Sequence, residues 1–525
     1  MIRMVGISIV HAPSIEGSEE MPGLTRREFI KGAAGTGAVL LTPLGRLGGS
    51  PARAATAYDC IVVGAGFAGL AAAYKLKLLG LRVKLLESRA QAGGICWTET
   101  EYGYRFPMGT TYVSAPWGRS AARKIYESLL QTWYQKVPEP FDSFWYNSQL
   151  LVDKTIFYNW DQIPGVTAKQ SSDCAALSAW FVDMYDKIRW PIYHNKGRAL
   201  EKYETMTIRQ MIASFLPGCD PWVLGCIDSF VRGTFNGNID EVGGLQGIDM
   251  LGDEYAGFAG RAHERGAADG ECIVGRYTYC VADLVDVLVA QIGAGAFAYG
   301  AAASAVDAGT DLVSVTYTQG GQQFTESAPY CVVATNAVVA RSIIQGQPPS
   351  VASALNSISY GEYAVVNLVM QSHTVPIHSY DCTLGDGEID DIYDFTFIKK
   401  KRQGIALDTP PGVYGCYIAA KSKGDHTPTL PADQLVTMCL DQLDSMFGAG
   451  TRNNVTSTHV ARYAQGMPIF HPGLTWLQLT ELVPPMNDRI LLAGDYVRGS
   501  PTVEGALEAG WHAGARIARK LRRGA

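Results

Sequence analysis

The chain has 525 residues, of which 47% are hydrophobic and 18% are charged. These proportions are typical of a globular protein with room for two or three domains, and they exclude a largely disordered chain. The formal net charge of −6 gives no electrostatic reason for binding DNA or RNA, so we expect no nucleic-acid partner.

The first 55 residues have the pattern of an export signal. Residues 25–31 contain the pair Arg26 and Arg27, an apolar stretch follows at 32–44, and residues 52–55 form a small-residue cleavage pattern. The alternative is a basic amphipathic start to the first domain, but the order of the three regions favours a twin-arginine signal. We therefore expect a signal peptide with an upstream extension at 1–55, the twin-arginine export machinery as a partner, and a periplasmic or secreted protein.

Permanent membrane insertion is not expected. The apolar stretch at 32–44 is too short and too rich in glycine to span a bilayer. No later apolar run is long enough for a transmembrane helix.

A glycine motif follows the first predicted strand, Ile61 to Val63. Gly64 allows a tight turn, Gly66 lets the backbone approach a pyrophosphate, and Gly69 lets a helix pack closely on the strand. The helix is expected over 70–79. Its N-terminus presents free N–H groups and a positive dipole end to phosphates.

A second strand is predicted over 82–86, and it ends in Glu87. The Glu87 carboxylate can accept hydrogen bonds from a ribose diol, and an acid at this position disfavours a 2′-phosphate. The order of strand, glycine turn, helix, strand and acid predicts a dinucleotide site at 58–94. The alternative is an ordinary helix–strand turn.

A second motif lies at 489–521. A buried strand, Ile490 to Ala493, ends at Gly494 and Asp495, and a helix begins around Val503. Asp495 is placed to bind a polyol chain. Small residues give this helix a smooth face for close packing, namely Gly505, Ala506, Ala509, Gly510, Ala513 and Gly514. The alternative is a tight helix–sheet contact with a chance acid.

Together the two ends resemble the FAD-binding signatures of the flavin-dependent amine oxidase superfamily, which includes monoamine and polyamine oxidases, protoporphyrinogen oxidases and phytoene desaturases. The resemblance implies an α/β fold in which a doubly wound, Rossmann-like FAD-binding domain accompanies a mixed α+β substrate-binding domain. It also extends to 107–111, the glycine-rich segment that passes the flavin, and to 275–277 and 332–336. The N–H groups of Gly505 and Ala506 would stabilise negative charge on the reduced flavin ring.

The resemblance implies a set of residues that contact FAD. Glu87 would hold the adenosine ribose, and Arg89 would lie near the pyrophosphate. The full set is Gly64, Gly66, Phe67, Ala68, Gly69, Glu87, Ser88, Arg89, Gly93, Gly94, Ile95, Met108, Gly109, Thr110, Thr111, Gly494, Asp495, Thr502, Val503 and Ala506.

The chain also departs from the family pattern. Ile95 and Cys96 stand where an arginine usually follows the glycine pair, and no lysine occurs at 363–367, where many members place one near flavin N5. Thr502 replaces a tyrosine of the aromatic cage. No cysteine occurs in 455–525, so we predict non-covalent FAD. Candidate pocket residues are Tyr112, Trp117, Phe470, His471 and Thr502.

The motifs divide the chain into an interrupted FAD domain and a two-part substrate domain. We expect FAD-domain segments at 56–119, 271–345 and 471–525, a mainly helical substrate segment at 120–270, and a sheet-rich one at 346–470. Predicted helices within the substrate segments are 121–131, 208–215 and 432–447, and predicted strands are 364–370 and 412–420.

Three further sequence patterns give weaker indications of function. The acidic run Asp386–Asp394 and the basic run Lys399–Arg402 predict a solvated hairpin, without the ligand spacing of a metal site. His471 and His512 are expected to be structural rather than catalytic. The eleven cysteines are expected to be mostly buried thiols, including Cys96, although two pairs could be oxidised, Cys219 with Cys226 and Cys272 with Cys280.

The sequence thus predicts an FAD-dependent oxidoreductase that acts on a small organic molecule. The leading hypothesis is oxidation of an amine by hydride transfer to flavin N5, with dioxygen or another acceptor reoxidising the flavin. A desaturase or isomerase acting on an apolar or carbocyclic compound is the first alternative. A flavin-binding protein without turnover is the second. No residue stands out as a proton-abstracting base.

Overall fold

The computed structural model describes residues 56–114, 120–129, 132–189, 192–195, 197–258, 272–371, 375–385, 387–474 and 476–523. The predicted export signal and Trp117 lie outside these ranges, as does Asp386. The remainder of the chain from Thr56 onward forms one compact unit. The internal boundaries of the FAD and substrate segments stay predictions.

A parallel sheet carries both predicted cofactor motifs. Its strand order is β10–β2–β1–β14–β22, and each neighbouring pair is parallel. The strands are β10 (Phe297–Tyr299), β2 (Val83–Glu87), β1 (Cys60–Val63), β14 (Tyr330–Val333) and β22 (Ile490–Leu492). The predicted strands at 61–63, 82–86, 332–333 and 490–493 are confirmed, and three distant stretches of chain supply one sheet.

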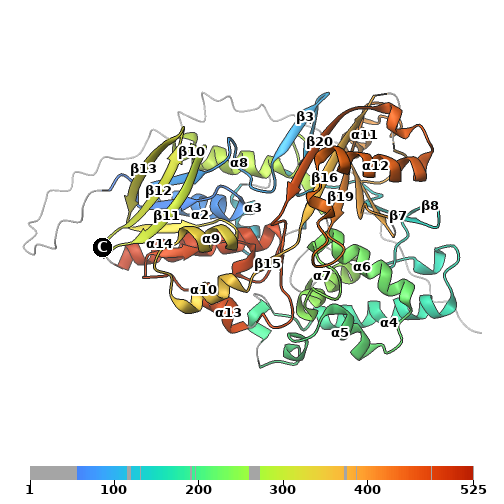
Figure 1. The fold of residues 1–525 in the computed structure, drawn as a ribbon, viewed down its shortest axis with the longest axis horizontal. Helices are drawn as coiled ribbons and strands as arrows, with labels where there is room; N and C mark the ends of the chain where they lie inside the picture. The colour runs from blue at the N-terminus through green and yellow to red at the C-terminus, as the bar shows by residue number, and fades with distance from the viewer. Residues whose placement is uncertain are drawn as a thin grey trace, which may run out of the picture. The chain divides into compact units, whose positions relative to one another are not determined.

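Helices α2 (Phe67–Leu78) and α14 (Val503–Arg523) pack against each other beside this sheet (Figure 1). Their contact is very close, because a Cβ placed on Gly510 would lie 1.9 Å from the Ala68 carbonyl oxygen. A Cβ on Gly514 would lie 2.8 Å from the Ala72 carbonyl oxygen. The predicted smooth face of the last helix is therefore confirmed, and it packs against α2.

Further elements complete the part of the fold around the parallel sheet. Strands β11 (Ala301–Ala308), β12 (Val313–Gln319) and β13 (Gln322–Ala328) form an antiparallel meander that contacts β1 and β2. Other elements around it are β3 (Thr98–Glu101), β4 (Tyr104–Pro107), β5 (Val113–Ser114), β9 (Cys272–Gly275), α8 (Ala282–Ile292), α9 (Ala337–Ile343), α10 (Pro349–Asn356), β15 (Ser359–Tyr360), β21 (Pro468–Ile469) and α13 (Trp476–Glu481).

A seven-stranded sheet forms the second layer of the fold. Its order is β20 (Val455–Tyr463), β16 (Tyr363–Met370), β19 (Gly412–Ala419), β18 (Asp391–Asp394), β17 (Asp381–Leu384), β7 (Asp142–Tyr146) and β8 (Gln149–Val152). One face of the sheet packs on α12 (Ala432–Phe447) through aliphatic side chains. The opposite face is lined by aromatic side chains.

Helices dominate residues 120–258, as predicted. They are α3 (Ala121–Ser128), α4 (Ala168–Tyr185), α5 (Ile208–Phe215), α6 (Pro221–Phe235) and α7 (Gly244–Phe258). The same stretch also contains β6 (Tyr134–Lys136) and the sheet strands β7 and β8, which the sequence did not predict. Among the described helices, none has the length and apolar character needed to cross a membrane.

The prediction of a solvated hairpin at the acidic and basic runs is wrong. Asp391–Asp394 form β18 inside the seven-stranded sheet, and Lys400 on α11 (Phe397–Gln403) is only 1% exposed. Partners make this burial possible, since Arg232 pairs with Asp390 and the Lys400 ammonium donates to the Leu407 carbonyl. Polar residues with such partners are stable in an interior.

All eleven cysteines are free thiols in the structure. Ten of them are buried, and Cys272 is partly buried. Neither Cys219 with Cys226 nor Cys272 with Cys280 forms a disulfide, so the reading of the cysteines as small buried side chains holds.

Candidate active site

In the glycine turn after β1, backbone segments approach each other too closely to leave room for side chains. Gly64 has φ +96°, and a Cβ there would lie 2.6 Å from the Ala334 carbonyl oxygen. Gly94 approaches Gly66 so closely that its Cβ would lie 3.2 Å from the Gly66 Cα. Helix α2 begins directly after Gly66, which has no side chain to cap it. The first N–H groups of α2, around Phe67 and Ala68, are thus available to a pyrophosphate.

Glu87 ties this turn to the end of β2. Its carboxylate accepts from the Ala65 N–H at 2.8 Å and from the Arg89 N–H at 2.8 Å, and Ser88 Oγ lies 3.2 Å away. The Arg89 guanidinium donates to the Gly94 carbonyl at 2.9 Å. A cavity of about 190 Å³ lies alongside, lined in part by Ala90 to Ala92, Trp97 and Tyr299. This arrangement fits the adenosine half of a dinucleotide.

Side chains of the seven-stranded sheet hold the segment 107–111 by its carbonyl oxygens. Asn367 donates to Pro107 at 3.0 Å, Tyr463 to Met108 at 2.6 Å, Tyr417 to Gly109 at 2.6 Å and Tyr380 to Thr111 at 3.1 Å. These donors lie on β16, β20, β19 and just before β17. The segment predicted to pass the flavin therefore lies on the aromatic face of the sheet.

The register of the strands explains this aromatic face. Val365 pairs with Tyr417, Asn367 with Gly415, and Gly415 with Tyr393, so their side chains share one side of the sheet. The Tyr393 and Tyr417 ring centroids are 4.9 Å apart, and the Tyr363 and Tyr417 centroids are 5.8 Å apart.

Tyr112, a predicted pocket residue, joins this group. Its ring lies 5.2 Å from that of Phe141 and 6.5 Å from that of Tyr393, measured between centroids. Burial raises the pKa of the Tyr112 phenol well above its usual value, so the ring acts as a neutral wall.

The second motif places Asp495 directly after β22. Its Oδ1 accepts from the Tyr496 N–H at 2.9 Å, and burial raises the pKa of the Asp495 carboxyl to about 7. The side chain keeps some accessible surface, which suits a polar contact to a bound polyol. Gly494 brings the backbone against the Tyr496 ring, since a Cβ there would lie 2.5 Å from that ring.

Thr502, a predicted pocket and cofactor residue, caps the last helix. Its Oγ1 accepts from the Gly505 N–H at 3.0 Å, and its carbonyl oxygen accepts from the Ala506 N–H at 3.0 Å. Both N–H groups therefore have an acceptor within the chain, and their predicted role at the reduced flavin ring stays a prediction. A threonine at an N-cap position is favoured for this reason. Val503, a predicted cofactor contact, is the first residue of α14.

The remaining pocket candidates, Phe470 and His471, contact other parts of the chain. Phe470 is buried in a different hydrophobic cluster from the aromatic face, and its carbonyl oxygen accepts from the Gly243 N–H. His471 contacts the carbonyl oxygens of Pro472 and Ser357 at 3.0 and 3.1 Å. His512 pairs with Glu508 one turn away on α14. These contacts are compatible with the expected structural role of both histidines, which stays a prediction.

Two departures from the family pattern were noted in the sequence, at Cys96 and at residues 363–367. Cys96 is a buried thiol, as expected by default, and burial raises its pKa well above its usual value. Residues 363–367 do form part of β16 on the aromatic face, and Asn367 is the polar side chain there. The Asn367 amide nitrogen donates to the Pro107 carbonyl oxygen, whereas Oδ1 has no hydrogen-bond partner among the described residues.

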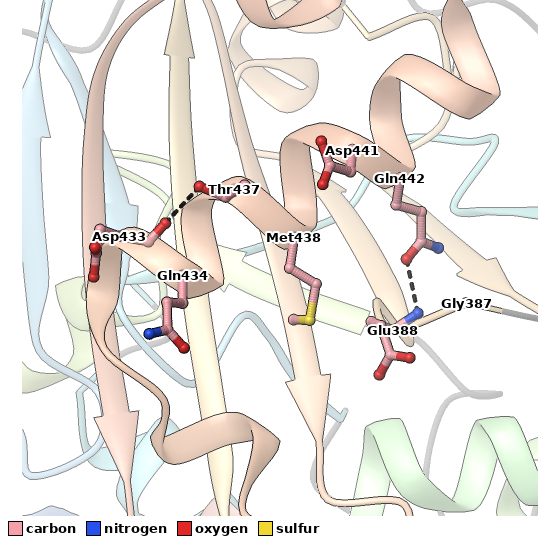
Figure 2. Close-up of a pocket in the computed structure, with 8 residues that line it drawn as sticks. All are labelled: Gly387, Glu388, Asp433, Gln434, Thr437, Met438, Asp441 and Gln442. Atoms are coloured by element: carbon pink, nitrogen blue, oxygen red, sulfur yellow. Dashed lines mark hydrogen bonds between the residues drawn. The ribbon is translucent and has the colours of Figure 1, made fainter.

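A larger groove of about 510 Å³ lies on the outside of α12. Figure 2 shows its lining, including Glu388, Asp433, Met438 and Gln442, with the Gln442 carbonyl accepting from the Glu388 N–H at 2.8 Å. None of these residues belongs to a predicted cofactor motif, although Glu388 lies in the acidic run. The groove lies between α12 and the loop that follows β17, which contributes Gly387 and Glu388 to its lining.

The model of the flavin containing amine oxidoreductases matches residues 67–518, which is most of the chain. The chain belongs to this family. It is an FAD-dependent oxidoreductase related to the amine oxidases, and the glycine turn, Glu87 and Asp495 are the residues that would hold the cofactor. Non-covalent attachment is typical of such proteins.

This flavin containing amine oxidoreductase is similar to a solved structure over most of its length and to two curated relatives over a shorter stretch. Cyclohexylamine oxidase from Brevibacterium oxydans IH-35A has the same fold, with a TM-score of 0.66 at 19% identity over 89% of this chain and 100% of that one. A pseudooxynicotine dehydrogenase from Pseudomonas sp. is 32% identical over 19% of this chain and 22% of its own. An all-trans-retinol 13,14-reductase from Macaca fascicularis is 38% identical over 18% and 16%. The chain therefore matches only about a fifth of these curated relatives.

Most residues of the aromatic face of this flavin containing amine oxidoreductase could not be identified from the sequence. The residues concerned are Trp97, Tyr363, Asn367, Tyr380, Tyr393, Tyr417 and Tyr463. Alternation within 363–370 and 412–419 predicts which side chains share a face of one strand. Pairing between strands is not visible in one sequence, so the group could not be assembled beforehand.

Proposed function

We propose that this chain oxidises an organic amine, with dioxygen or another acceptor as the final oxidant. The observation that supports this most is the aromatic face of the sheet, which is hydrogen-bonded to the segment 107–111 of the FAD domain. FAD supplies hydride acceptance at its N5 atom when it is bound. The protein then has to hold a substrate C–H bond in place and keep water out.

The chain's own residues suit these two tasks. Tyr417, Tyr393 and Tyr112 are neutral phenols in a desolvated wall, because burial raises the pKa of each well above its usual value. Such rings favour the neutral form of a nearby amine through exclusion of water, and they contact its hydrocarbon part. No side chain of this wall is assigned as a general base.

The test is reduction of the bound flavin under anaerobic conditions. Purified protein is mixed with a panel of primary and secondary amines, and bleaching of the flavin absorbance is followed with time. We expect bleaching by at least one amine and release of H₂O₂ or reduction of a dye when an acceptor is added. Bleaching only by substrates that lack nitrogen would overturn the amine assignment.

Desaturation or isomerisation of an apolar compound is the second candidate. Two observations favour it, namely the absence of lysine at 363–367 and the retinol reductase among the relatives. A long polyene or carbocycle needs an apolar tunnel, whereas the described face carries several carboxyl and phenol groups. Incubation with polyenes and cyclic ketones, followed by product analysis, separates the two candidates.

We also propose that residues 25–55 direct export of this protein by the twin-arginine route to the periplasm or beyond. The support is the sequence order of Arg26 and Arg27, the apolar stretch and the small-residue pattern. Replacement of both arginines by lysine is expected to keep the protein in the cytoplasm. Unchanged export of that double variant, measured by cell fractionation, would refute the proposal.

A further inference from the structure

Helices α2 and α14 lie side by side and run in the same direction (Figure 1). Gly510 of α14 lies against Ala68, whereas Gly514, one turn later, lies against Lys75 further along α2. A Cβ on Gly514 would be only 3.1 Å from the Lys75 Cβ. The C-terminal ends of both helices therefore point toward the same end of the molecule. The first turn of α2, which is available to a pyrophosphate, lies at the other end of that helix, about 16 Å away.

The Lys75 side chain faces α14 near its C-terminal half. The Lys75 ammonium lies 4.1 Å from the centre of the Trp511 ring. Arg519 and Arg522 follow Trp511 at helical spacing, so they lie on the same side of α14, and both are exposed. Leu78 follows Lys75 by one turn of α2 and is 51% exposed. Three cations and an exposed apolar side chain thus occupy one end of this helix pair.

Helix α3 adds a further cation to this group. The Tyr74 hydroxyl on α2 donates to Ser128 Oγ on α3 at 3.0 Å, and Lys124 lies one turn before Ser128 on the same face of α3. Burial, followed by the charges of Lys124 and Arg522, lowers the pKa of the Lys75 ammonium. Cations without a neighbouring acid shift a lysine in this direction. The basic patch consists of Lys75, Lys124, Arg519 and Arg522.

The three helices supply no acid that neutralises the basic patch. Helix α2 contains no Asp or Glu, and the only acid of α3, Glu127, pairs with Arg123. On α14, Glu504 lies in the first turn and Glu508 pairs with His512. Within the described part of the chain, no cation of the basic patch forms an ion pair.

The helix dipole explains only part of the basic patch. Cations are favoured near the C-terminal ends of helices, which accounts for Lys75 on α2 and for Arg519 and Arg522 on α14. Lys124 lies in the N-terminal half of α3, where a positive charge is disfavoured. The whole chain has a formal net charge of −6, so the basic patch is a local excess of positive charge on an acidic protein. Such an excess attracts an anionic partner.

We propose that the basic patch docks this protein on the surface of a membrane rich in anionic phospholipids. Exposed Leu78 beside Lys75 favours lipid over an acidic protein, because surfaces that bind membranes combine cations with apolar side chains that enter the headgroup layer. An electron-accepting protein is disfavoured, since the basic patch lies at the end of α2 away from the turn that would hold the cofactor. Docking of this kind is peripheral and does not depend on the proposed amine oxidation.

The experiment measures binding to vesicles by co-sedimentation. Full-length holoprotein is mixed with vesicles of POPC alone or of POPC with about 30% POPG, in about 50 mM and about 500 mM NaCl. We expect binding to the POPG vesicles only, and loss of that binding at the higher salt concentration, because salt screens charges at a surface. Residues 1–55 contain Arg26 and Arg27, so all variants are compared in the same full chain.

The triple variant Lys75→Gln, Lys124→Gln and Arg522→Gln tests the basic patch directly. The partition onto POPG vesicles should fall about 100-fold, because each cation near an anionic surface contributes about fivefold. Leu78→Gln should weaken binding severalfold at low salt, since its apolar side chain no longer enters the headgroup layer. FAD content and Tm should match wild type in both variants, which shows that the loss does not come from misfolding.

A matched triple variant removes the same charge elsewhere. Lys202, Lys401 and Lys423 are exposed and lie outside the basic patch, so their replacement by Gln should leave vesicle binding within about twofold of wild type. Equal binding to both kinds of vesicle, or wild-type binding by the patch variant, would overturn the proposal. Capture of labelled poly-L-glutamate without binding to POPG vesicles would assign the basic patch to an acidic protein instead. If the patch variant does not fold, Lys124→Gln alone should lower the partition about fivefold.

Discussion

Tyr417 donates its phenolic hydrogen to the carbonyl oxygen of Gly109 over 2.6 Å, although the two residues are 308 positions apart. Gly109 cannot carry a side chain there, because a Cβ would lie 2.3 Å from the Ile95 carbonyl oxygen. The segment at 107–111 is thus fixed by the glycine loop on one side and by the sheet on the other. The sheet that carries the aromatic face thus also positions the backbone stretch that we predict to pass the flavin.

Tyr417→Phe is expected to loosen this segment. The change leaves the buried Gly109 carbonyl without its donor, which costs about 1–3 kcal/mol of stability. The Tm and the FAD affinity should both fall, because we predict that this segment passes the flavin. Tyr102→Phe, at a side chain that is 55% exposed, is the control and should behave as wild type. Equal stability of the two variants would show that the hydrogen bond does not hold the segment.

Gly510→Ala is expected to separate α14 from α2. The added methyl would lie 1.9 Å from the Ala68 carbonyl oxygen, so the helices must move apart, at a cost of about 1–3 kcal/mol or more. Because α2 carries the N–H groups offered to the pyrophosphate, the purified variant should contain less FAD. Gly225→Ala on α6 is the matched control. A Cβ there meets nothing within 4 Å, and the substitution should stabilise the helix by about 0.5–1 kcal/mol. The same Tm shift for both variants would contradict the packing argument.

Glu87→Gln is expected to weaken FAD binding. The amide keeps one acceptor but loses the charge, and its NH₂ group would face the Ala65 or Arg89 N–H that the carboxylate now accepts. Loss of one charge-assisted hydrogen bond is worth about 1.5–3 kcal/mol, or about tenfold or more in Kd. Titration of apoprotein with FAD, followed by flavin fluorescence, measures this. Glu127→Gln, in a surface pair with Arg123, should leave the Kd unchanged.

Glu504 predicts a pH dependence of stability. Burial raises the pKa of its carboxyl from the ordinary 4.5 to about 7, and Oε1 has no partner among the described residues. The folded state therefore holds a proton that the unfolded state has lost. The stabilisation is full below the unfolded pKa and disappears as pH rises through about 7, with a size on the order of 3 kcal/mol.

Glu504→Gln removes this titration. The Tm of the variant, relative to that of wild type, should rise from about pH 5 to about pH 8, because only the wild type loses stability over that range. Thermal scans at several pH values in matched ionic strength make the comparison. A difference in Tm that is the same at every pH would mean that Glu504 titrates normally.

The cofactor elements could be predicted because their chemistry is local. Gly64, Gly66 and Gly69 act within one turn, and the smooth face at Gly510 and Gly514 is a property of one helix. Helices at 208–215 and 432–447 were likewise visible from periodicity alone, and the structure confirms their bounds. The sequence also placed 107–111 at the flavin by resemblance, without showing what holds it there.

The aromatic face could not be predicted because its assembly depends on pairing between distant strands. Nothing near Tyr417 in the sequence indicates Val365 or Asp391 as its neighbours across the sheet. The acidic run was misread for the same reason, since the partner of Asp390 is Arg232, on a helix far away in sequence. The cap formed by Thr502 was not foreseen either, because a cap and a pocket wall can occupy the same motif position.

The placement of β22 at the edge of the parallel sheet, next to β14, has a consequence for biosynthesis. While the ribosome is still translating, β14 has an open hydrogen-bonding edge and α2 lacks the helix that covers it, because residues 490–523 are synthesised after both. An open edge of this kind invites pairing with other chains. Messages cut short before Ile490 should therefore yield aggregated or degraded polypeptide instead of a weaker enzyme.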